Sequence, residues 1–106
     1  MAMGSYSIGA TVRIPLQVTE GGIAHTGSIS PTITSIIKPD GTSDSNFPDS
    51  MIEVDHNYGT YSYDYIPSEV GDYVVIITYT VDSQEYTSLE YFTVKSIVAV
   101  PRAEAR

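Results

Sequence analysis

Residues 59–73 read GTYSYDYIPSEVGDY, and this stretch decides the fold. Tyr61, Tyr63 and Tyr65 recur at every second position, which places their side chains on one face of a β-strand. A Gly-x-Tyr unit stands at each end of the stretch, and glycine adopts backbone angles that other residues avoid. Pro67 marks a break after the tyrosine strand. The stretch therefore predicts two consecutive strands joined by a proline-marked corner.

Alternating apolar and polar residues predict further strands on both sides of this stretch. The expected strands cover residues 12–18, 32–38, 51–56, 60–66, 73–81 and 85–94. Pro15 cannot donate a ladder hydrogen bond, so the first strand is expected at a sheet edge. In the second, Ile33 and Ile37 are expected to point one way and Ile36 the other. The strand at 73–81 is partly apolar on both faces, which predicts a place inside a sheet.

The chain is the length of one domain, with 106 residues and no cysteine. Turn signals recur about every ten residues, and Asp82-Ser83 predicts a tight hairpin. The pattern predicts an all-β fold, an immunoglobulin-like antiparallel β-sandwich of about seven strands without a disulfide. Residues 1–10 form an N-terminal segment that can supply a first strand, residues 11–95 form the sandwich, and residues 96–106 are expected to be a flexible tail.

The block at residues 59–94 resembles the C-terminal half of filamin-type immunoglobulin repeats. The family has a Gly-x-Tyr unit, a strand, a proline, a second Gly-x-Tyr unit, a long strand, a hairpin and a closing Phe-x-Val. The residues in matching places are Gly59, Tyr61, Tyr65, Pro67, Gly71, Tyr73, Phe92 and Val94. The family's Ser-Pro before the closing phenylalanine is replaced by Glu90-Tyr91, and the N-terminal half lacks a filamin signature, so actin crosslinking is not inferred.

The segments TVRIPLQVTEGG (11–22) and TSIIKPDGT (34–42) look like small immunoglobulin-like modules of phage structural proteins and bacterial surface proteins. Tyr73 is similar to the tyrosine corner of immunoglobulin domains, and Val75 stands where a disulfide cysteine would fall. By the alternation argument, Tyr61, Tyr73 and Tyr79 are expected in core or corner positions.

These resemblances imply a non-catalytic structural or protein-interaction module. It would be a small phage virion component of the head or tail, or a domain of a larger surface assembly. Filamin-type repeats take a partner strand beside two of their strands, and the nearest equivalents here are residues 32–38 and 51–56. The candidate partner contacts are Ile36, Met51, Glu53, Tyr58, Tyr86 and Tyr91, and the structural signature consists of Gly59, Tyr61, Pro67, Gly71, Tyr73 and Phe92. The expected partner is a protein, bound by strand addition or by self-assembly.

Charge is distributed unevenly along the chain, whose net charge is −8. Eleven acidic residues and no Lys or Arg lie between Lys38 and Lys95. Nucleic acid and anionic membranes are bound through clustered basic side chains, so neither is expected as a partner. The acidity suits a soluble surface that resists association, and it also suits attraction to a basic partner or to cations.

One acidic loop offers an alternative function, that of a calcium-tuned adhesion module of a bacterial or archaeal surface protein. Asp40, Asp44 and Asp49 supply the hard oxygen ligands that calcium prefers. Their spacing does not match a calcium loop with alternating ligands and a terminal glutamate, and turn-forming residues give the same composition.

Nothing in the sequence indicates an enzyme or a cofactor. His25 and His56 are too few for a convincing metal site, and no serine lies in a nucleophile-elbow context. Gly21-Gly22 lacks the lysine and helix of a phosphate-binding loop. The sequence contains no recognisable signal peptide and no apolar stretch long enough to span a bilayer, so localisation stays open between a virion and an extracellular protein.

Overall fold

The computed structural model of the chain describes residues 2–20, 23–24, 29–55 and 59–96, and within these ranges every regular element is a β-strand. The strands are β1 (Ala2–Ser7), β2 (Val12–Gln17), β3 (Thr19–Glu20), β4 (Ile23–Ala24), β5 (Thr32–Ile37), β6 (Asp49–Ser50), β7 (Ile52–Asp55), β8 (Thr60–Tyr65), β9 (Gly71–Val81) and β10 (Gln84–Lys95). The described residues include no helix that is long and apolar enough to cross a membrane.

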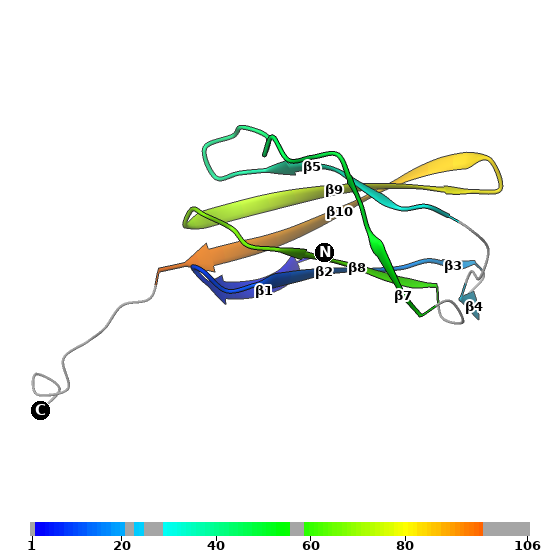
Figure 1. Cartoon of the computed structure of the whole chain (residues 1–106), viewed down its shortest axis with the longest axis horizontal. Helices are drawn as coiled ribbons and strands as arrows, with labels where there is room; N and C mark the ends of the chain where they lie inside the picture. Colours follow the sequence, from blue (N-terminus) through cyan, green and yellow to red (C-terminus); the bar gives the residue numbers. More distant parts are fainter. Residues whose placement is uncertain (1, 21–22, 25–28, 56–58, 97–106) are drawn as a thin grey trace, which may run out of the picture.

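The strands form two main sheets that lie as two layers (Figure 1). The five-stranded sheet has the order β1-β10-β9-β5-β6, and the three-stranded sheet has the order β2-β8-β7. These sheets hold eight strands of the described chain, one more than the sequence predicts, and β3 and β4 form a separate two-stranded hairpin. The all-β, two-sheet prediction is confirmed. β2 is an edge strand and β9 an interior one, as Pro15 and the apolar faces of residues 73–81 predict.

One pairing departs from the expected antiparallel arrangement, because β1 runs parallel to β10. Parallel neighbours need a long crossover connection, and here nearly the whole domain lies between the two strands. β9 and β10 form the expected hairpin, with Val81 paired to Gln84. Asp82 and Ser83 both have positive φ, 51° and 67°, which is the geometry of the two-residue turn that matches strand twist.

The core lies between the two sheets and follows the period of two. In β2, Val12, Ile14 and Leu16 are buried while the residues between them are exposed. These three pair in register with Tyr65, Tyr63 and Tyr61 of β8. The opposing layer contributes buried side chains from β5, β9 and β10, namely Ile33, Ile36, Tyr73, Val75, Ile77, Phe92 and Val94.

The corner before β9 is built around Tyr73. Its hydroxyl donates to the Glu69 carbonyl at 2.8 Å and accepts from the Glu69 N–H at 3.0 Å. Its ring stacks on Phe92 with centroids 4.8 Å apart and an interplanar angle of 6°. Gly71, two residues earlier, has φ +135°, and a Cβ added there would lie 2.7 Å from the Pro39 Cβ. The Gly-x-Tyr unit is therefore needed for both backbone geometry and space.

The predicted orientation of Ile36 is wrong. Strict alternation from Ile33 points Ile36 to the opposite face, but both side chains are fully buried. The register between β5 and β9 shifts between Ile33 and Ser35, where the strand is irregular. An extra residue in one strand reverses the facing of every residue after it, so Ile36 enters the core. Ile36, one of the candidate partner contacts, is therefore a buried core residue and offers no exposed side chain.

Candidate functional site

A short segment, residues 49–55, forms one side of the sandwich and is named the crossing edge below. Its first part, β6, is the last described strand of the five-stranded sheet and pairs with β5. Its second part, β7, is the last described strand of the other sheet and pairs with β8. Between them, the Met51 N–H donates to the Pro31 carbonyl at 3.0 Å. The chain thus passes from one sheet to the other and borders both (Figure 1).

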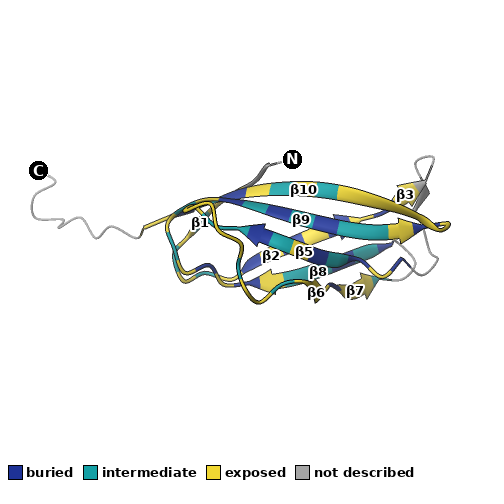
Figure 2. Cartoon of the chain, turned by 90° about the horizontal axis from the view of Figure 1, so that it is seen from above, coloured by how far each residue is buried: buried dark blue, intermediate teal, exposed yellow. Residues whose placement is uncertain are grey.

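The crossing edge carries both apolar and acidic side chains, and its pairing with β8 shifts register between Glu53 and Asp55. Ile52 and Val54 are 69% and 61% exposed, Glu53 between them is also exposed, and Asp55 is half-buried. Figure 2 shows this strand as one of the exposed margins of the molecule. Exposed apolar residues on an edge strand favour pairing with another chain, and natural proteins usually avoid them unless they are used. This makes β7 the best candidate for a binding edge.

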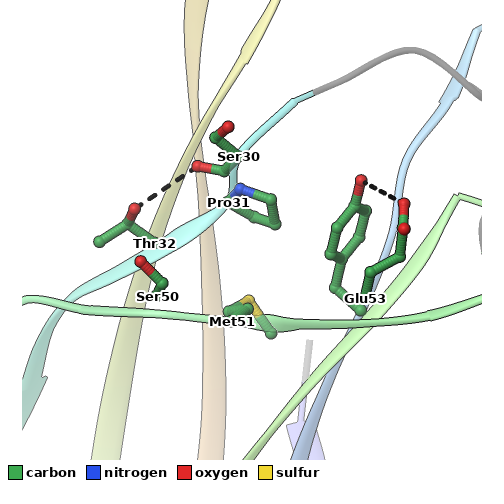
Figure 3. Close-up of a pocket in the computed structure, with 7 residues that line it drawn as sticks. Ser30, Pro31, Thr32, Ser50, Met51 and Glu53 are labelled. Atoms are coloured by element: carbon green, nitrogen blue, oxygen red, sulfur yellow. Dashed lines mark hydrogen bonds between the residues drawn. The ribbon is translucent and has the colours of Figure 1, made fainter.

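A surface hollow of about 450 Å³ lies beside the crossing edge, where the margins of the two sheets face each other (Figure 3). Its walls are the start of β5, the crossing edge and β8, with the lining residues Ser30, Pro31, Thr32, Ser50, Met51, Glu53 and Tyr61. Glu53 accepts a hydrogen bond from the Tyr61 hydroxyl at 3.3 Å, and both residues line this hollow. The hollow is therefore accessible from the side of β7 and carries a carboxylate.

Three tyrosine hydroxyls from β8 hold the segment that leads into and through the crossing edge. Tyr61 donates to Glu53, Tyr63 donates to Asp49 at 2.6 Å, and Tyr65 donates to Asp44 at 2.8 Å. Because the tyrosines alternate along β8, their rings lie on the core side while their hydroxyls reach its margin. We call these three bonds the tyrosine clamp.

The clamp shifts the pKa values of its members. Burial raises the pKa of Tyr63 to about 12, helped by its hydrogen bond to Asp49. Burial also raises the pKa of Tyr61, with a further contribution from the Glu53 charge. Burial alone would raise the pKa of Asp44, but bonds from the Asn46 N–H and Tyr65 outweigh it and hold that pKa below its usual value. The tyrosines stay protonated and Asp44 stays ionised at neutral pH.

A second hollow, of about 650 Å³, lies around the other two bonds of the clamp. It is lined by Asp44, Asn46, Phe47, Asp49, Tyr63, Asp64, Tyr65, Ile66 and Ser68. The Phe47 ring lies 5.4 Å from that of Tyr63 and 5.9 Å from that of Tyr65, so Phe47 anchors its polar loop to the core. Asp64 forms an exposed ion pair with Arg13 at 3.0 Å.

The three acidic residues of the calcium hypothesis accept hydrogen bonds from neighbouring residues in their own turns. Asp40 accepts from the Thr42 N–H and hydroxyl, and Asp49 accepts from the Ser50 N–H as well as from the tyrosine clamp. Within the described part of the chain, no group of three or more His, Asp or Glu side chains could hold a metal ion. Asp40, Asp44 and Asp49 are therefore not brought together as a ligand set.

The remaining candidate partner contacts divide between core and surface. Met51 is only 8% exposed and packs in the core, and it also lines the hollow beside the crossing edge, so its contact role stays a prediction. Tyr86 and Tyr91 are exposed by 46% and 43%. Tyr86 stacks on the half-buried Tyr79 with centroids 5.7 Å apart. Tyr58, like His25 and His56, lies outside the described residues.

The signature residues lie at the core and its corners. Tyr61, Tyr73 and Phe92 are buried core residues, and Pro67 is also fully buried. Gly59 and Gly71 both have positive φ, 62° and 135°.

The alternation of Ile52 and Val54 with Glu53 and Asp55 predicts the strand, but sequence reasoning selects only Glu53 as a contact. The two apolar residues were missed because an isolated apolar residue is usually assigned to the core. The signal that would identify them is the shortness of the strand combined with its acidic alternate positions, which is typical of an edge.

The chain matches no protein-family model and no curated protein. Its fold is similar to part of the solved structure of an endo-fucoidan hydrolase from glycoside hydrolase family 107, with a TM-score of 0.59 and 12% sequence identity. That match covers 92% of this chain and 13% of the enzyme chain. At this level of identity, the likeness is one of fold.

Proposed function

We propose that the chain is a non-catalytic, immunoglobulin-like interaction module that binds a protein partner by strand addition at β7. It would act as a small phage virion component, of the head or tail, or as a domain of a larger surface assembly. The observation that carries this proposal is the position of β7 at the end of its sheet, with Ile52 and Val54 exposed to solvent.

The strand order supports the immunoglobulin-like assignment. Immunoglobulin sandwiches place strands B, E and D in one sheet and C, F and G in the other. Here β2, β8 and β7 correspond to B, E and D, while β5, β9 and β10 correspond to C, F and G. The Tyr73 hydroxyl bonds back to Glu69, as a tyrosine corner does. The resemblance of residues 59–94 to filamin-type repeats agrees with this assignment.

The chemistry of the hollows supports a non-catalytic role. Asp44 and Asp49 both line the second hollow, and glycoside hydrolysis usually depends on a pair of carboxylates. In that reaction one carboxyl group acts as a general acid with a raised pKa, and the lowered pKa of Asp44 does not suit that role.

Of the two segments expected to accept a partner strand, β7 is the better site. β5 pairs with β9 on one side, and on the other it is bordered by β6, by the bridge from Ile37 to Ser43 and by the Asp44 N–H, which donates to the Ile36 carbonyl. β7 is the last described strand of its sheet. Strand addition to β7 would use main-chain hydrogen bonds for affinity and its exposed side chains for specificity.

The test is capture of the partner from the native source, followed by hydrogen exchange on the complex. The double variant Ile52→Ser, Val54→Ser removes the exposed apolar pair, and Leu89→Ser removes an exposed apolar residue of the other sheet as a matched control. We expect wild type and Leu89→Ser to capture the partner, the double variant to lose it, and the amides of β7 to become protected. Protection elsewhere with unchanged exchange in β7 would overturn strand addition at this edge.

A further inference from the structure

We propose that two copies of this chain associate face to face through the outer face of the five-stranded sheet. The outer face consists of the outward residues of β9 and β10 together with Ser35 and Ile37 of β5, and these three strands lie side by side (Figure 2). β9 and β10 pair without a register shift along their whole length, so their outward positions are well defined. The contact is separate from strand addition, because β7 belongs to the other sheet.

Apolar side chains run across the middle of the outer face. Tyr91, Val74 and Ile37 are cross-strand neighbours in one row, and Leu89 and Ile76 are neighbours in the next. The side chains on β10 are the more exposed, by 43% at Tyr91 and 44% at Leu89, and the other three residues are half-buried. The two rows form an apolar patch that continues over three strands. Such patches on soluble proteins mark interaction sites.

Charged side chains are few on the outer face, although the chain has a net charge of −8. On β9 and β10, the outward charged residues are Asp72, Glu85 and Lys95. Asp72 already accepts a hydrogen bond from the Thr93 hydroxyl at 2.7 Å. Two acidic copies can therefore approach along this face with little direct repulsion between carboxylates.

The charges at the two ends of β10 favour a two-fold pairing of copies. We place the axis between the copies, perpendicular to the strands and crossing β10 at Glu90, so that each strand runs antiparallel to its own counterpart. Lys95 of one copy then lies over Glu85 of the other, and symmetry repeats this contact between opposite charges. The same axis sets Asp72 over Thr78 of the second copy. The charge pattern of the outer face is thus complementary to itself.

A hollow of about 380 Å³ beside Tyr91 gives the outer face a complementary shape. Its lining includes the outward residues Val74 and Tyr91, and on β1 it includes Gly4, which has no side chain to fill the space. The two-fold axis sets the exposed Leu89 of the second copy over Tyr91, at the margin of this hollow. Each copy therefore supplies both a projecting side chain and a hollow, as an interface between identical surfaces requires.

The size of the outer face predicts a weak dimer. It is about 33 Å long from Glu85 to Lys95 and, over three strands, about 14 Å wide, from the usual rise per residue and strand spacing. These dimensions give about 450 Å² per copy and about 900 Å² in total, at the low end of specific interfaces. We therefore expect reversible association with a dissociation constant above about 1 μM.

The experiment measures molar mass by sedimentation equilibrium from about 10 μM to about 1 mM, with amide spectra of isotope-labelled protein over the same range. We expect the mass to rise from one copy toward two, and the signals of residues 74–76 and 87–91 to shift. Leu89→Ser should weaken the dimer at least about tenfold, because symmetry removes the apolar contact twice. The double variant Ile52→Ser, Val54→Ser changes exposed apolar residues of the other sheet, so as a matched control it should associate like wild type.

Exchanging the charges of β10 tests the two-fold pairing. Glu85→Lys sets lysine over lysine and should weaken the dimer about tenfold. Adding Lys95→Glu restores the opposite charges, so the double variant should associate within about threefold of wild type. Glu53→Lys makes the same change in net charge on β7 and should not weaken the dimer, because it lowers the repulsion between copies. Thermal melting checks that each variant is folded.

Each alternative result overturns a named part of the inference. A mass of one copy at every concentration, or a Leu89→Ser variant that associates as strongly as wild type, overturns the outer face as the contact. A mass above two copies overturns the closed two-fold arrangement. If Lys95→Glu fails to rescue Glu85→Lys, the placement of Lys95 over Glu85 is wrong. Strand addition at β7 is tested separately, by partner capture.

Discussion

Removing one hydroxyl from the tyrosine clamp tests whether it holds the acidic segment in place. In Tyr65→Phe the buried ring stays, and only the bond to Asp44 at 2.8 Å is lost. Hydrogen bonds to a charged group contribute about 1.5–3 kcal/mol, and because Asp44 is partly solvated we expect the lower end, about 1.5 kcal/mol. For a domain of this length, that corresponds to a fall in melting temperature of roughly 6–10 °C.

The assay is denaturant unfolding at several pH values, with Tyr86→Phe as the exposed control, expected within about 0.5 kcal/mol of wild type. The lowered pKa of Asp44 means that its stabilisation is present above its unfolded pKa of about 4 and is lost as pH falls through its folded pKa. The difference between wild type and Tyr65→Phe should therefore be full at neutral pH and shrink in acid.

A double-mutant cycle with Asp44→Asn decides whether the loss belongs to this bond. The coupling energy between Tyr65→Phe and Asp44→Asn should be about 1 kcal/mol, because each change removes the same charge-assisted interaction. A coupling near zero, or a Tyr65→Phe variant as stable as wild type, would refute the clamp as a stabilising contact.

Three further predictions concern the corner and the rest of the clamp. Tyr73→Phe should lower the free energy of unfolding by about 2 kcal/mol, since it removes both bonds to Glu69 while keeping the ring stack. Gly71→Ala should cost about 2–4 kcal/mol in the same measurement, because its φ is +135° and its Cβ would lie 2.7 Å from that of Pro39. The raised pKa of Tyr63 means that its stabilisation is present below about pH 10 and is lost as pH rises toward 12, so the stability difference between wild type and Tyr63→Phe should shrink above about pH 10.

The glycine prediction has a matched control variant, and each of the two tyrosine predictions has a result that would contradict it. Gly41→Ala also changes a glycine of positive φ, +88°, but no atom lies within 4 Å of its added Cβ, so it should cost less than Gly71→Ala. If Gly41→Ala and Gly71→Ala lower the free energy of unfolding equally, the steric argument for Gly71 is contradicted. A Tyr73→Phe protein as stable as wild type would contradict the corner's contribution, and a Tyr63→Phe difference that stays constant up to pH 12 would contradict the assigned titration.

The strands of the second half follow from the sequence because their signals are local. Gly71 and Tyr73 mark the corner, and the apolar alternation of β9 gives its buried face directly. The facing of Ile36 could not be predicted, because one irregular pairing with β9 reverses the alternation and leaves no trace in composition. The bond from Tyr65 to Asp44 joins residues 21 positions apart and depends on how the loop folds back over the core. Site geometry of that kind requires the tertiary structure.

The tyrosine strand connects the fold to the proposed site. Its rings fill the core side of β8, and its hydroxyls hold Asp44, Asp49 and Glu53 on the segment that leads into and through the crossing edge. A binding edge held in this way loses less conformational entropy when a partner strand is added, because its backbone is already in place. Conversely, loss of the hydroxyls would leave the apolar and acidic side chains of β7 unchanged but remove this advantage. In the proposed function, the clamp thus gives a short edge strand a defined position for the addition of a partner strand.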